Sequence, residues 1–255
     1  MYNLVVCAIF KNESHILEEW IIHYLSRGFE HIYLVNDFST DDYLPIIDKF
    51  GSYVTLFQND IVTKTVGKQI TIYEKYFRPI LINTRWAAIL DLDEFLYSPT
   101  NHKITDIINA CRNCAEIKVD WLHFGSNGHI AQPSSVIEGF TKRAAFDRQK
   151  EYYGHKSFFR PDKLIRFDIH FHYVDGVSKH FNYSDDASVM MVINHYNIQS
   201  RDFFLNVKCT RGDINNWFDH IKKTRDIQLF NKYDVNEIED RRLLDQNIQF
   251  NINPK

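Results

Sequence analysis

Glycine and proline are scarce in this sequence, at 9 and 6 of 255 residues. No stretch therefore has the composition of a flexible linker or a disordered tail. Hydrophobic residues make up 44% of the chain and are spread over its whole length. A chain of this length can bury one sizeable core. We therefore expect a single ordered domain over residues 1–255.

An excess of charge of one sign is also absent, because 30 basic and 33 acidic residues give a formal net charge of -3. The sequence thus gives no reason to expect a nucleic-acid partner. No apolar run approaches the roughly 20 residues that cross a bilayer, and the first residues lack the basic leader and cleavage site of a signal peptide. We expect a cytoplasmic protein with no transmembrane segment. Aromatic residues near the C-terminus leave a homo-oligomer or a peripheral membrane contact open.

Cysteine is limited to Cys7, Cys111, Cys114 and Cys209, which include one CxxC pair. A four-ligand zinc site would need a second pair, or histidines at matching spacing. We therefore expect free thiols, which fit a reducing compartment.

The first half of the chain alternates strand-like apolar runs with helical patterns. The strand-like runs lie at residues 4–10, 32–35, 53–57 and 86–90. Between the first two, apolar residues from Ile16 to Leu25 recur at helical spacing, with Asn12 or Ser14 available as a cap and Gly28 placed to end the helix. Further helices are predicted at about 43–50 and about 68–84, and Pro79 should kink or shorten the latter. This alternation predicts an α/β fold with a mostly parallel sheet.

The second half has a looser pattern. Short strands are predicted within residues 119–124, 164–174 and 189–196, and amphipathic helices at about 214–225 and 235–246. His170 and His172 would alternate on one face of such a strand, where they could form a metal pair or simply be exposed. We assign them no role.

Three acidic residues follow the apolar run at 86–90, in the sequence ILDLDEF. They fall at the carboxyl edge of the predicted sheet, where open α/β sheets bind ligands. If strand geometry persists, Asp91 and Asp93 face one side while Leu90 and Leu92 stay buried. Converging carboxylates repel one another unless a cation lies between them, and Mg²⁺ or Mn²⁺ would keep positions open for phosphate oxygens. The alternative is an acidic cluster that caps a helix or faces water.

A second acidic turn, NDFSTDD at residues 36–42, follows the second strand-like run. Its polar side chains would lie along the same sheet edge and could contact a base or a ribose. The alternative is an ordinary Asx or Ser/Thr turn that caps the helix starting near Tyr43.

Several motifs occur in the order found in one enzyme group: KNE at 11–13, EW at 19–20, NDFSTD at 36–41, DLDEF at 91–95, WLHFGSNG at 121–128 and NHY at 194–196. Ser200, Phe203, Lys208 and Arg211 follow them. Over residues of about 4–212 the chain resembles GT-A glycosyltransferases, particularly the family 2-like and family 92 group. The resemblance implies a GT-A, Rossmann-like fold, in which a mostly parallel sheet flanked by helices precedes a smaller mixed region. Residues of about 1–98 would form a nucleotide-sugar-binding half, and about 99–255 an acceptor-side half with the C-terminal helices.

The resemblance also implies an activity, namely metal-dependent transfer of a sugar from a nucleotide-diphosphate sugar to an acceptor hydroxyl. The expected donor is a UDP-sugar, and the acceptor a glycan, glycolipid or glycoprotein. Lys11, Asn12, Glu13 and Asp37 would contact the nucleoside. The metal site, with Mn²⁺ or Mg²⁺, would include Asp91, Asp93 and His195.

Other site residues have two interpretations each. Lys208 and Arg211 could neutralise charge on the leaving diphosphate, or could simply be cations at a solvated helix end. Trp121 and Phe124 could pack against a sugar or belong to the core, and His195 could be a core histidine.

The catalytic base is the least determined part of the site. Phe38 stands where family 2 enzymes usually carry glycine, and no Glu-Asp pair occupies the expected base position. Asp120 and Asp147 are the candidates for taking a proton from the acceptor hydroxyl. Whether transfer inverts or retains the sugar's configuration stays open.

Two other classes of function compete with this interpretation. A haloacid-dehalogenase-like phosphate-transfer enzyme also begins its nucleophilic motif with Asp-x-Asp after an apolar strand, although Phe95 stands where that motif needs Thr or Val. A GT-A module that binds a sugar or a partner without turnover is the second.

Overall fold

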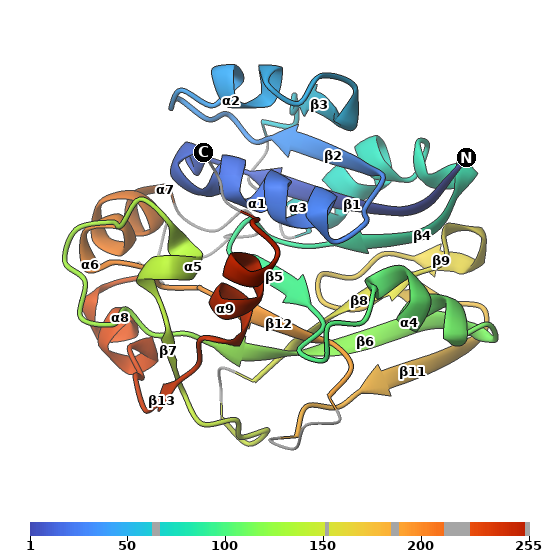
Figure 1. Cartoon of the computed structure of the whole chain (residues 1–255). Coiled ribbons are helices and arrows are strands. Elements are labelled where there is room, and N and C mark those ends of the chain that lie inside the picture. The colour runs from blue at the N-terminus through green and yellow to red at the C-terminus, as the bar shows by residue number, and fades with distance from the viewer. Residues whose placement is uncertain (63–66, 151–152, 185–188, 212–224, 253–255) are drawn as a thin grey trace.

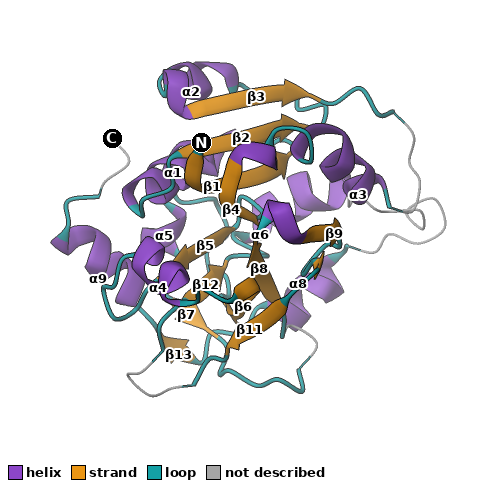
Figure 2. Cartoon of the chain, turned by 90° about the vertical axis from the view of Figure 1, so that its right-hand side faces the viewer, coloured by secondary structure: helices purple, strands orange, loops and turns teal. Residues whose placement is uncertain are grey.

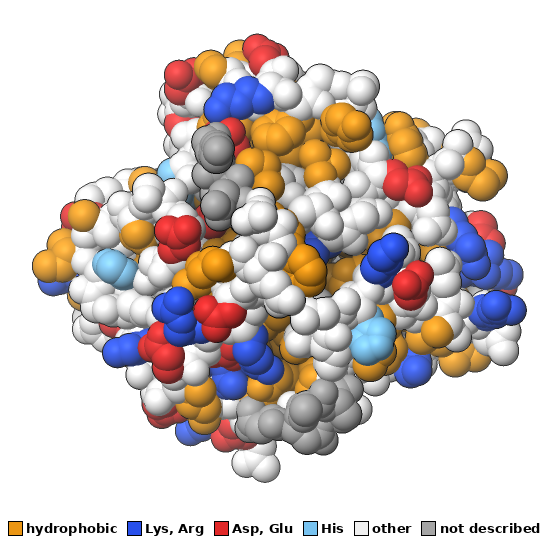
Figure 3. All heavy atoms as spheres, in the orientation of Figure 1, with side chains coloured by type: hydrophobic (Ala, Val, Ile, Leu, Met, Phe, Trp, Pro, Cys, Tyr) orange, Lys and Arg blue, Asp and Glu red, His pale blue; other side chains and the backbone are white. Residues whose placement is uncertain are grey.

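The structure is a computed structural model of the chain and describes residues 1–62, 67–150, 153–184, 189–211 and 225–252. No helix among these residues is both long and apolar enough to span a bilayer. Acidic and basic side chains alternate over the face shown in Figure 3, so no field of one sign covers it.

Four parallel strands form the first part of a large sheet, as predicted (Figure 1). They are β1 (Tyr2–Phe10), β2 (His31–Asn36), β3 (Val54–Gln58) and β4 (Thr84–Ile89). Their order in the sheet is β3-β2-β1-β4. The carboxyl ends of all four therefore lie along one edge.

The sheet continues with strands from the second half, and in the described residues it contains nine strands. The added strands are β5 (Glu94–Tyr97), β6 (Cys114–His123), β8 (His155–Phe159), β11 (Val177–Phe181) and β12 (Val192–His195). β8 joins β4 to β6 through two antiparallel pairings, while β11 and β12 run parallel to β6. β5 pairs antiparallel with β12. The sheet is thus mostly parallel in its first half and mixed in its second.

Helices cover both faces of the sheet (Figure 2). α1 (Ser14–Ser26) lies on one face, while α3 (Lys68–Ile72) and the π-helical turn Tyr73–Phe77 lie on the other. Alternate residues of β1 accordingly enter two separate cores: Val6 packs with α1, and Cys7 packs with the π-helical turn. The strand is buried on both sides, which explains its nearly continuous apolar sequence.

The start of α1 differs from the prediction. Glu13 is its N-cap residue and makes no side-chain capping hydrogen bond. The Asn12 side chain instead accepts a hydrogen bond from the Thr40 amide at 2.7 Å, and the Ser14 amide donates to the Asp41 carboxylate at 2.7 Å. The helix start is therefore held by the loop after β2. Gly28 follows the helix with a φ of 89°, as its predicted stop position requires.

The predicted helix at 68–84 is shortened at Pro79, as expected. α3 and its π-helical turn end at Phe77, two residues before Pro79, which removes a backbone donor and clashes with the preceding turn. α2 (Leu44–Asp48) likewise covers only part of the predicted 43–50.

The remaining elements are short. The helices are α4 (Ile104–Ala110), α5 (Val136–Gly139), α6 (Arg201–Phe203), α7 (Cys209–Arg211), α8 (Ile227–Tyr233) and α9 (Arg242–Gln249). Two small ribbons pair β9 (Leu164–Arg166) with β10 (Tyr173–Val174), and β7 (Lys142–Arg143) with β13 (Ile238–Glu239).

Three predictions in the second half need comment. The predicted helix at 214–225 lies almost wholly outside the described residues. The prediction at 235–246 is wrong at its start, because β13 pairs with β7 and Asp240 accepts hydrogen bonds from Arg143 and Arg242 before α9 begins. The alternation of His170 and His172 on a strand is also wrong. The strand breaks after Arg166, and His172 turns into the core against Phe159, 4.4 Å between ring centroids.

Candidate active site

The acidic segment after β4 forms a tight turn at the sheet edge. β4 ends at Ile89, so strand geometry does not persist through Asp93 as we had supposed. The Glu94 amide instead donates to the Asp91 carbonyl at 3.0 Å. Leu90 and Leu92 are nevertheless buried, as predicted.

Side chains of α1 hold this turn. The Trp20 indole N–H donates to the carbonyls of Asp91 and Glu94, at 3.1 and 3.2 Å. The Tyr24 hydroxyl donates to the Glu94 carbonyl at 2.8 Å. Both rings are fully buried, so the backbone of the turn is fixed by a rigid part of the core.

Each aspartate of the turn has its own lysine rather than a cation shared between them. Lys156 on β8 donates to Asp91 Oδ2 at 3.0 Å, and Lys208 donates to Asp93 Oδ2 at 2.5 Å. Lys156 and Lys208 are 1% and 2% exposed. Buried charges are stable only when paired and hydrogen-bonded. The two lysines therefore stabilise the acidic turn at this edge of the sheet.

Asp93 is the buried member of the pair and Asp91 the open one. Burial alone would raise the pKa of Asp93, but Lys208 and His195 outweigh it and hold the pKa well below its usual range. The Asp93 side chain is 9% exposed, against 43% for Asp91. Lys208 and His195 thus favour the ionised form of the buried Asp93, whereas Asp91 also faces solvent.

A buried acid, Glu94, lies behind the turn. Its carboxylate accepts the Asp91 amide at 2.9 Å and lies 3.7 Å from the Lys156 ammonium. Burial raises the pKa of Glu94 well above its ordinary value, and Lys156 offsets this only in part. Lys156 therefore serves two acids at once.

His195, at the end of β12, faces Asp93. Its Nε2 atom lies 3.6 Å from Asp93 Oδ1, and its ring centroid lies 4.5 Å from that of Trp121. Its other nitrogen, Nδ1, is buried and has no hydrogen-bond partner among the described residues. The core residue His23 also has a buried Nδ1 atom without a partner among the described residues, although its Nε2 atom bonds the Leu96 carbonyl. The position of Nε2 beside Asp93 is therefore what distinguishes His195.

The donor set suits a metal that binds together with its nucleotide. No group of three or more His, Cys, Asp or Glu side chains is placed to hold a metal ion in the part of the chain that the structure describes. Asp93 Oδ1 and His195 Nε2 supply two neighbouring ligands of the right chemistry. Mg²⁺ and Mn²⁺ that bridge phosphates need only one or two protein ligands, because water and phosphate complete the shell. The residues present therefore fit such a metal.

The loops after β1 and β2 are tied to each other and to the end of α7. Arg211 donates to Glu13 Oε1 at 2.9 Å and to the Lys11 carbonyl. The Asn12 amide donates to the Ser39 hydroxyl at 3.0 Å. Lys11, Asn12, Glu13 and Arg211, which the sequence placed in one site, thus lie together.

Asp37 lies at the same edge, after β2, and is 5% exposed. It accepts hydrogen bonds from Lys68 at 2.7 Å and from Asn59 at 2.6 Å. The carboxylate is therefore oriented by the start of α3 and by the residue that follows β3.

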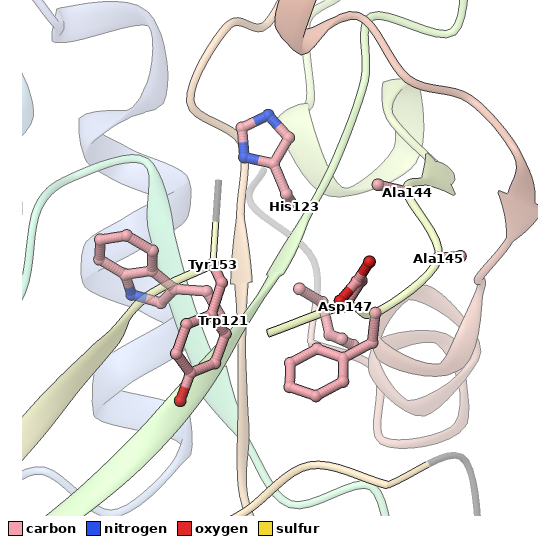
Figure 4. Close-up of a pocket in the computed structure, with 8 residues that line it drawn as sticks. Trp121, His123, Ala144, Ala145, Asp147 and Tyr153 are labelled. Carbon is pink, nitrogen blue, oxygen red and sulfur yellow. The ribbon is translucent and has the colours of Figure 1, made fainter. Parts of the chain in front are cut away.

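Trp121 lines a small hollow of about 10 Å³, room for about one water molecule (Figure 4). Asp147 and Tyr153 lie on the same hollow, as do His123 and Ala144. A Cβ atom at Gly154 would lie 2.3 Å from the Trp121 ring, so this glycine allows the close approach of backbone and indole. His170 lies edge-on to the same indole, 5.4 Å between ring centroids.

Phe124 does not share this hollow. It is 0% exposed and packs on Tyr196, 4.8 Å between ring centroids. Its suggested contact with a sugar is therefore not supported, and its side chain belongs to the core.

Asp120 is fully engaged by the protein. It accepts hydrogen bonds from His180 at 2.6 Å, Tyr153 at 3.1 Å, the Tyr183 amide at 2.8 Å and Arg148 at 3.3 Å. Although burial raises the pKa of this carboxyl, these donors outweigh it and lower the pKa. Such a group is a weak proton acceptor, which favours Asp147 among the two base candidates.

The residues that sequence reasoning missed are mainly the partners of the acids, Lys68 and Lys156. Glu94 was noted as the third acid of the turn, but its burial was not predicted. One signal was available for Lys156, which stands in the short apolar strand HKSFF, where a lysine facing inward needs an acidic partner. The pairing itself could not be read, because 65 residues separate Lys156 from Asp91.

Comparison with known proteins identifies the family of this chain. Residues 80–244 match the model of glycosyltransferase family 92. A family 92 protein of Ricinus communis is 27% identical over 216 residues, which cover 80% of this chain and 37% of that protein. One of Oryza sativa subsp. japonica is 26% identical over 215 residues, covering 80% of this chain and 34% of that protein. The chain thus spans little more than a third of the length of these curated relatives.

Solved structures resemble the chain only distantly. HddC from Yersinia pseudotuberculosis has a TM-score of 0.39 at 13% identity, over 71% of this chain and 90% of that one. UDP-glucose pyrophosphorylase complexed with UDP-glucose has a TM-score of 0.35 at 12% identity, over 64% of this chain and 77% of that one. These scores carry no inference about ligand or activity. The family match includes the acidic turn, Trp121, His195 and Lys208, and the chain belongs to glycosyltransferase family 92.

Proposed function

We propose that this chain is a metal-dependent glycosyltransferase that moves a sugar from a nucleotide-diphosphate sugar, with UDP as the nucleotide, to an acceptor hydroxyl of a glycan. One observation carries the proposal. The buried, ionised Asp93 lies between Lys208 and His195 at the carboxyl edge of the parallel strands, beside an indole that reaches the acceptor side.

On the donor side, Asp93 and His195 would hold Mn²⁺ or Mg²⁺, and Asp91 would face the ribose and the metal from its more open position. The metal, when bound, would withdraw electrons from the diphosphate and stabilise it as a leaving group. Lys208 and Arg211 would offset the negative charge that develops there. Both are already oriented by Asp93 and Glu13, so little reorganisation accompanies the reaction.

The nucleoside would lie over the loops that follow β1 and β2. Asp37 is held ready to accept a hydrogen bond from a base or ribose, because Lys68 and Asn59 both contact Oδ1 and neither contacts Oδ2 among the described residues. The loop of Lys11, Asn12 and Glu13 is held in place by Arg211. These contacts favour a preformed nucleoside site.

On the acceptor side, the partly exposed Trp121 would pack against the apolar face of a sugar. Asp147, across the hollow, would take the proton of the attacking hydroxyl. A base is required if the transfer inverts the configuration at the sugar.

The family assignment replaces the phosphate-transfer alternative, and the non-catalytic module is the alternative that experiment must exclude. A cytoplasmic location also stays part of the proposal, while a homo-oligomer and a peripheral membrane contact stay open. All four cysteines are free, in agreement with a reducing compartment.

Calorimetric titration with UDP, with and without Mn²⁺, tests the donor site. We would compare the wild type with Asp93→Asn, which keeps the shape of the side chain, and with Asp48→Asn as a matched control at an exposed site. The wild type and the control should bind UDP more than about tenfold more tightly when Mn²⁺ is present, and Asp93→Asn should lose this difference. GDP should bind more weakly than UDP.

Thermal unfolding of the same proteins shows whether Asp93→Asn still folds. Absence of metal-dependent binding of either nucleotide to the wild type would sink the proposal. Metal-dependent binding of UDP-sugars, with neither hydrolysis nor transfer to any acceptor in a broad screen, would identify the non-catalytic module instead.

A further inference from the structure

An exposed aromatic residue stands in a strained backbone conformation at the donor edge. Phe38 directly follows Asp37 in the loop after β2, and its φ is 59°. Bulky residues avoid this left-handed region because Cβ crowds the neighbouring carbonyl oxygen. The other described non-glycine residues with positive φ are amides, namely Asn12, Asn101, Asn127, Gln199 and Asn251. Phe38 is thus the one aromatic residue of the described chain in this conformation.

Packing does not account for the strain at Phe38. Its side chain is 44% exposed, whereas Asn36 and Asp37 just before it are each 5% exposed. A large apolar side chain that stays half in water contributes little burial to offset a strained backbone. The ring is therefore held outward, over the loop, at a cost to stability.

The surroundings of the ring are those of a ligand site. Lys68 Nζ lies 5.5 Å from the ring centroid and 2.7 Å from Asp37 Oδ1. An aromatic face, an ammonium and a buried carboxylate therefore adjoin one another where β2 ends. The loop is further fixed by Ser39, whose amide donates to Asn36 Oδ1 at 2.8 Å and whose hydroxyl accepts the Asn12 amide.

We propose that Phe38 is the surface on which the nucleobase of the donor stacks, an inference that rests on the proposed function. Nucleobases stack on aromatic side chains through their π-faces. Asp37, beside the ring, can accept a hydrogen bond from a ring N–H of the base, which adds direction to the stacking. The strained conformation presents the ring at the position that glycine would leave empty.

The test distinguishes binding of the nucleobase from binding of the diphosphate. Phe38→Asn removes the ring and introduces a residue that tolerates positive φ, while Phe38→Tyr keeps the ring. Tyr53→Asn, at the opposite end of β3 and 57% exposed, is a matched control for loss of an exposed aromatic. Each protein is titrated with UDP and with inorganic pyrophosphate, both in Mn²⁺, and its melting temperature is recorded.

Loss of the ring in Phe38→Asn should weaken UDP binding by about tenfold. It should leave pyrophosphate binding unchanged and the melting temperature at or above that of the wild type, because backbone strain is relieved. Phe38→Tyr and the control should bind UDP as the wild type does.

Several results would overturn the inference. They are an unchanged UDP affinity in Phe38→Asn, an equal loss of pyrophosphate binding, or a lowered melting temperature that marks the ring as structural. If the wild type binds neither UDP nor GDP, the proposed function fails and the stacking surface fails with it. If the wild type binds UDP and Phe38→Asn binds it equally well, the stacking surface alone is wrong.

Discussion

The first half of the chain supplies three acids to one edge of the sheet, and two of them are paired with lysines of the second half. The acids Asp37, Asp91 and Asp93 follow β2 and β4, the two strands on either side of β1. The cations Lys156 and Lys208 come from the second half. Asp37 is paired within the first half, with Lys68, whereas Asp91 and Asp93 depend on the second half for their cations. A buried ammonium without an acid is as costly as a buried carboxylate without a cation.

The two halves differ in the sequence distance between the residues that make each contact. In the first half, a strand, a turn and the next helix fix the position of an acid through local geometry. In the second half, Lys156 and Lys208 reach acids 65 and 115 residues away. We infer that the first half sets where the donor site lies, and that the second half sets its charge and the wall that faces the acceptor.

A substitution at Asp147 tests whether residues of the second half act on the acceptor without affecting donor binding. Asp147→Asn should lower the transfer rate by about 10² to 10⁴, the usual contribution of a general base, while UDP affinity stays unchanged because the first half is intact. Transfer is measured at saturating donor, and UDP binding by calorimetry.

Two further variants make the Asp147 result specific. Asp175→Asn, at an exposed position, is the matched control and should transfer at the wild-type rate. Wild-type transfer by Asp147→Asn, together with a large loss in His170→Gln, would instead assign the base to the imidazole that lies against Trp121.

A substitution at Lys156 tests whether ion pairs between the two halves stabilise the fold. Lys156→Met removes the ammonium from Asp91 and Glu94, leaving two acids without their cation. Burial already raises the pKa of Glu94, so this acid can take up a proton once its cation is lost, and Asp91 faces solvent. We therefore expect the free energy of unfolding to fall by about 1 to 3 kcal/mol, the cost of a buried polar contact that is left unmade. Urea denaturation measures the change.

The matched control for Lys156 is Lys49→Met, which breaks the exposed pair with Glu18 and should cost less than about 1 kcal/mol. Equal losses in the two variants would mean that the buried ammonium adds nothing beyond a surface ion pair.

The same contrast explains which features could be predicted from the sequence. The four parallel strands and α1 were predicted closely, because burial on one or both faces leaves a regular spacing of apolar residues. The acidic turn after β4 was placed correctly for the same reason, since it follows an apolar strand directly. Helix 242–249 and the ribbon of β7 and β13 were not, because pairing with a distant strand decides where α9 begins.

Partners of charged residues lay beyond what the sequence could show. Lys156 and Lys68 were not assigned any role, although they neutralise Asp91 and Asp37. Phe124 and Trp121 lie three residues apart with the same aromatic character, yet one is buried in the core and the other reaches the hollow. Only the three-dimensional arrangement of β6 against its neighbours separates them.

His172 gives the smallest expected effect and probes the packing of the second half alone. Burial between Phe159 and Phe167, followed by the charge of Lys156, lowers the pKa of His172 to about 3. Its ordinary pKa is about 6.5, so between these values the unfolded chain binds one more proton than the folded one. Stability is therefore full above about pH 6.5 and falls as the pH decreases, by up to about 1.4 kcal/mol per pH unit.

Urea denaturation from about pH 7 to about pH 5 measures this slope. Burial also lowers the pKa of His23, His123 and His170, so these residues add to the slope of the wild type. His172→Gln removes one of these groups and should reduce the slope by up to about 1.4 kcal/mol per pH unit. His102→Gln, at an exposed position, should leave the slope as it is in the wild type. An unaltered slope in His172→Gln would show that His172 is not held neutral by its surroundings. Because these surroundings lie on the second half only, a reduced slope with unchanged UDP affinity would separate the stability of that half from the donor site of the first.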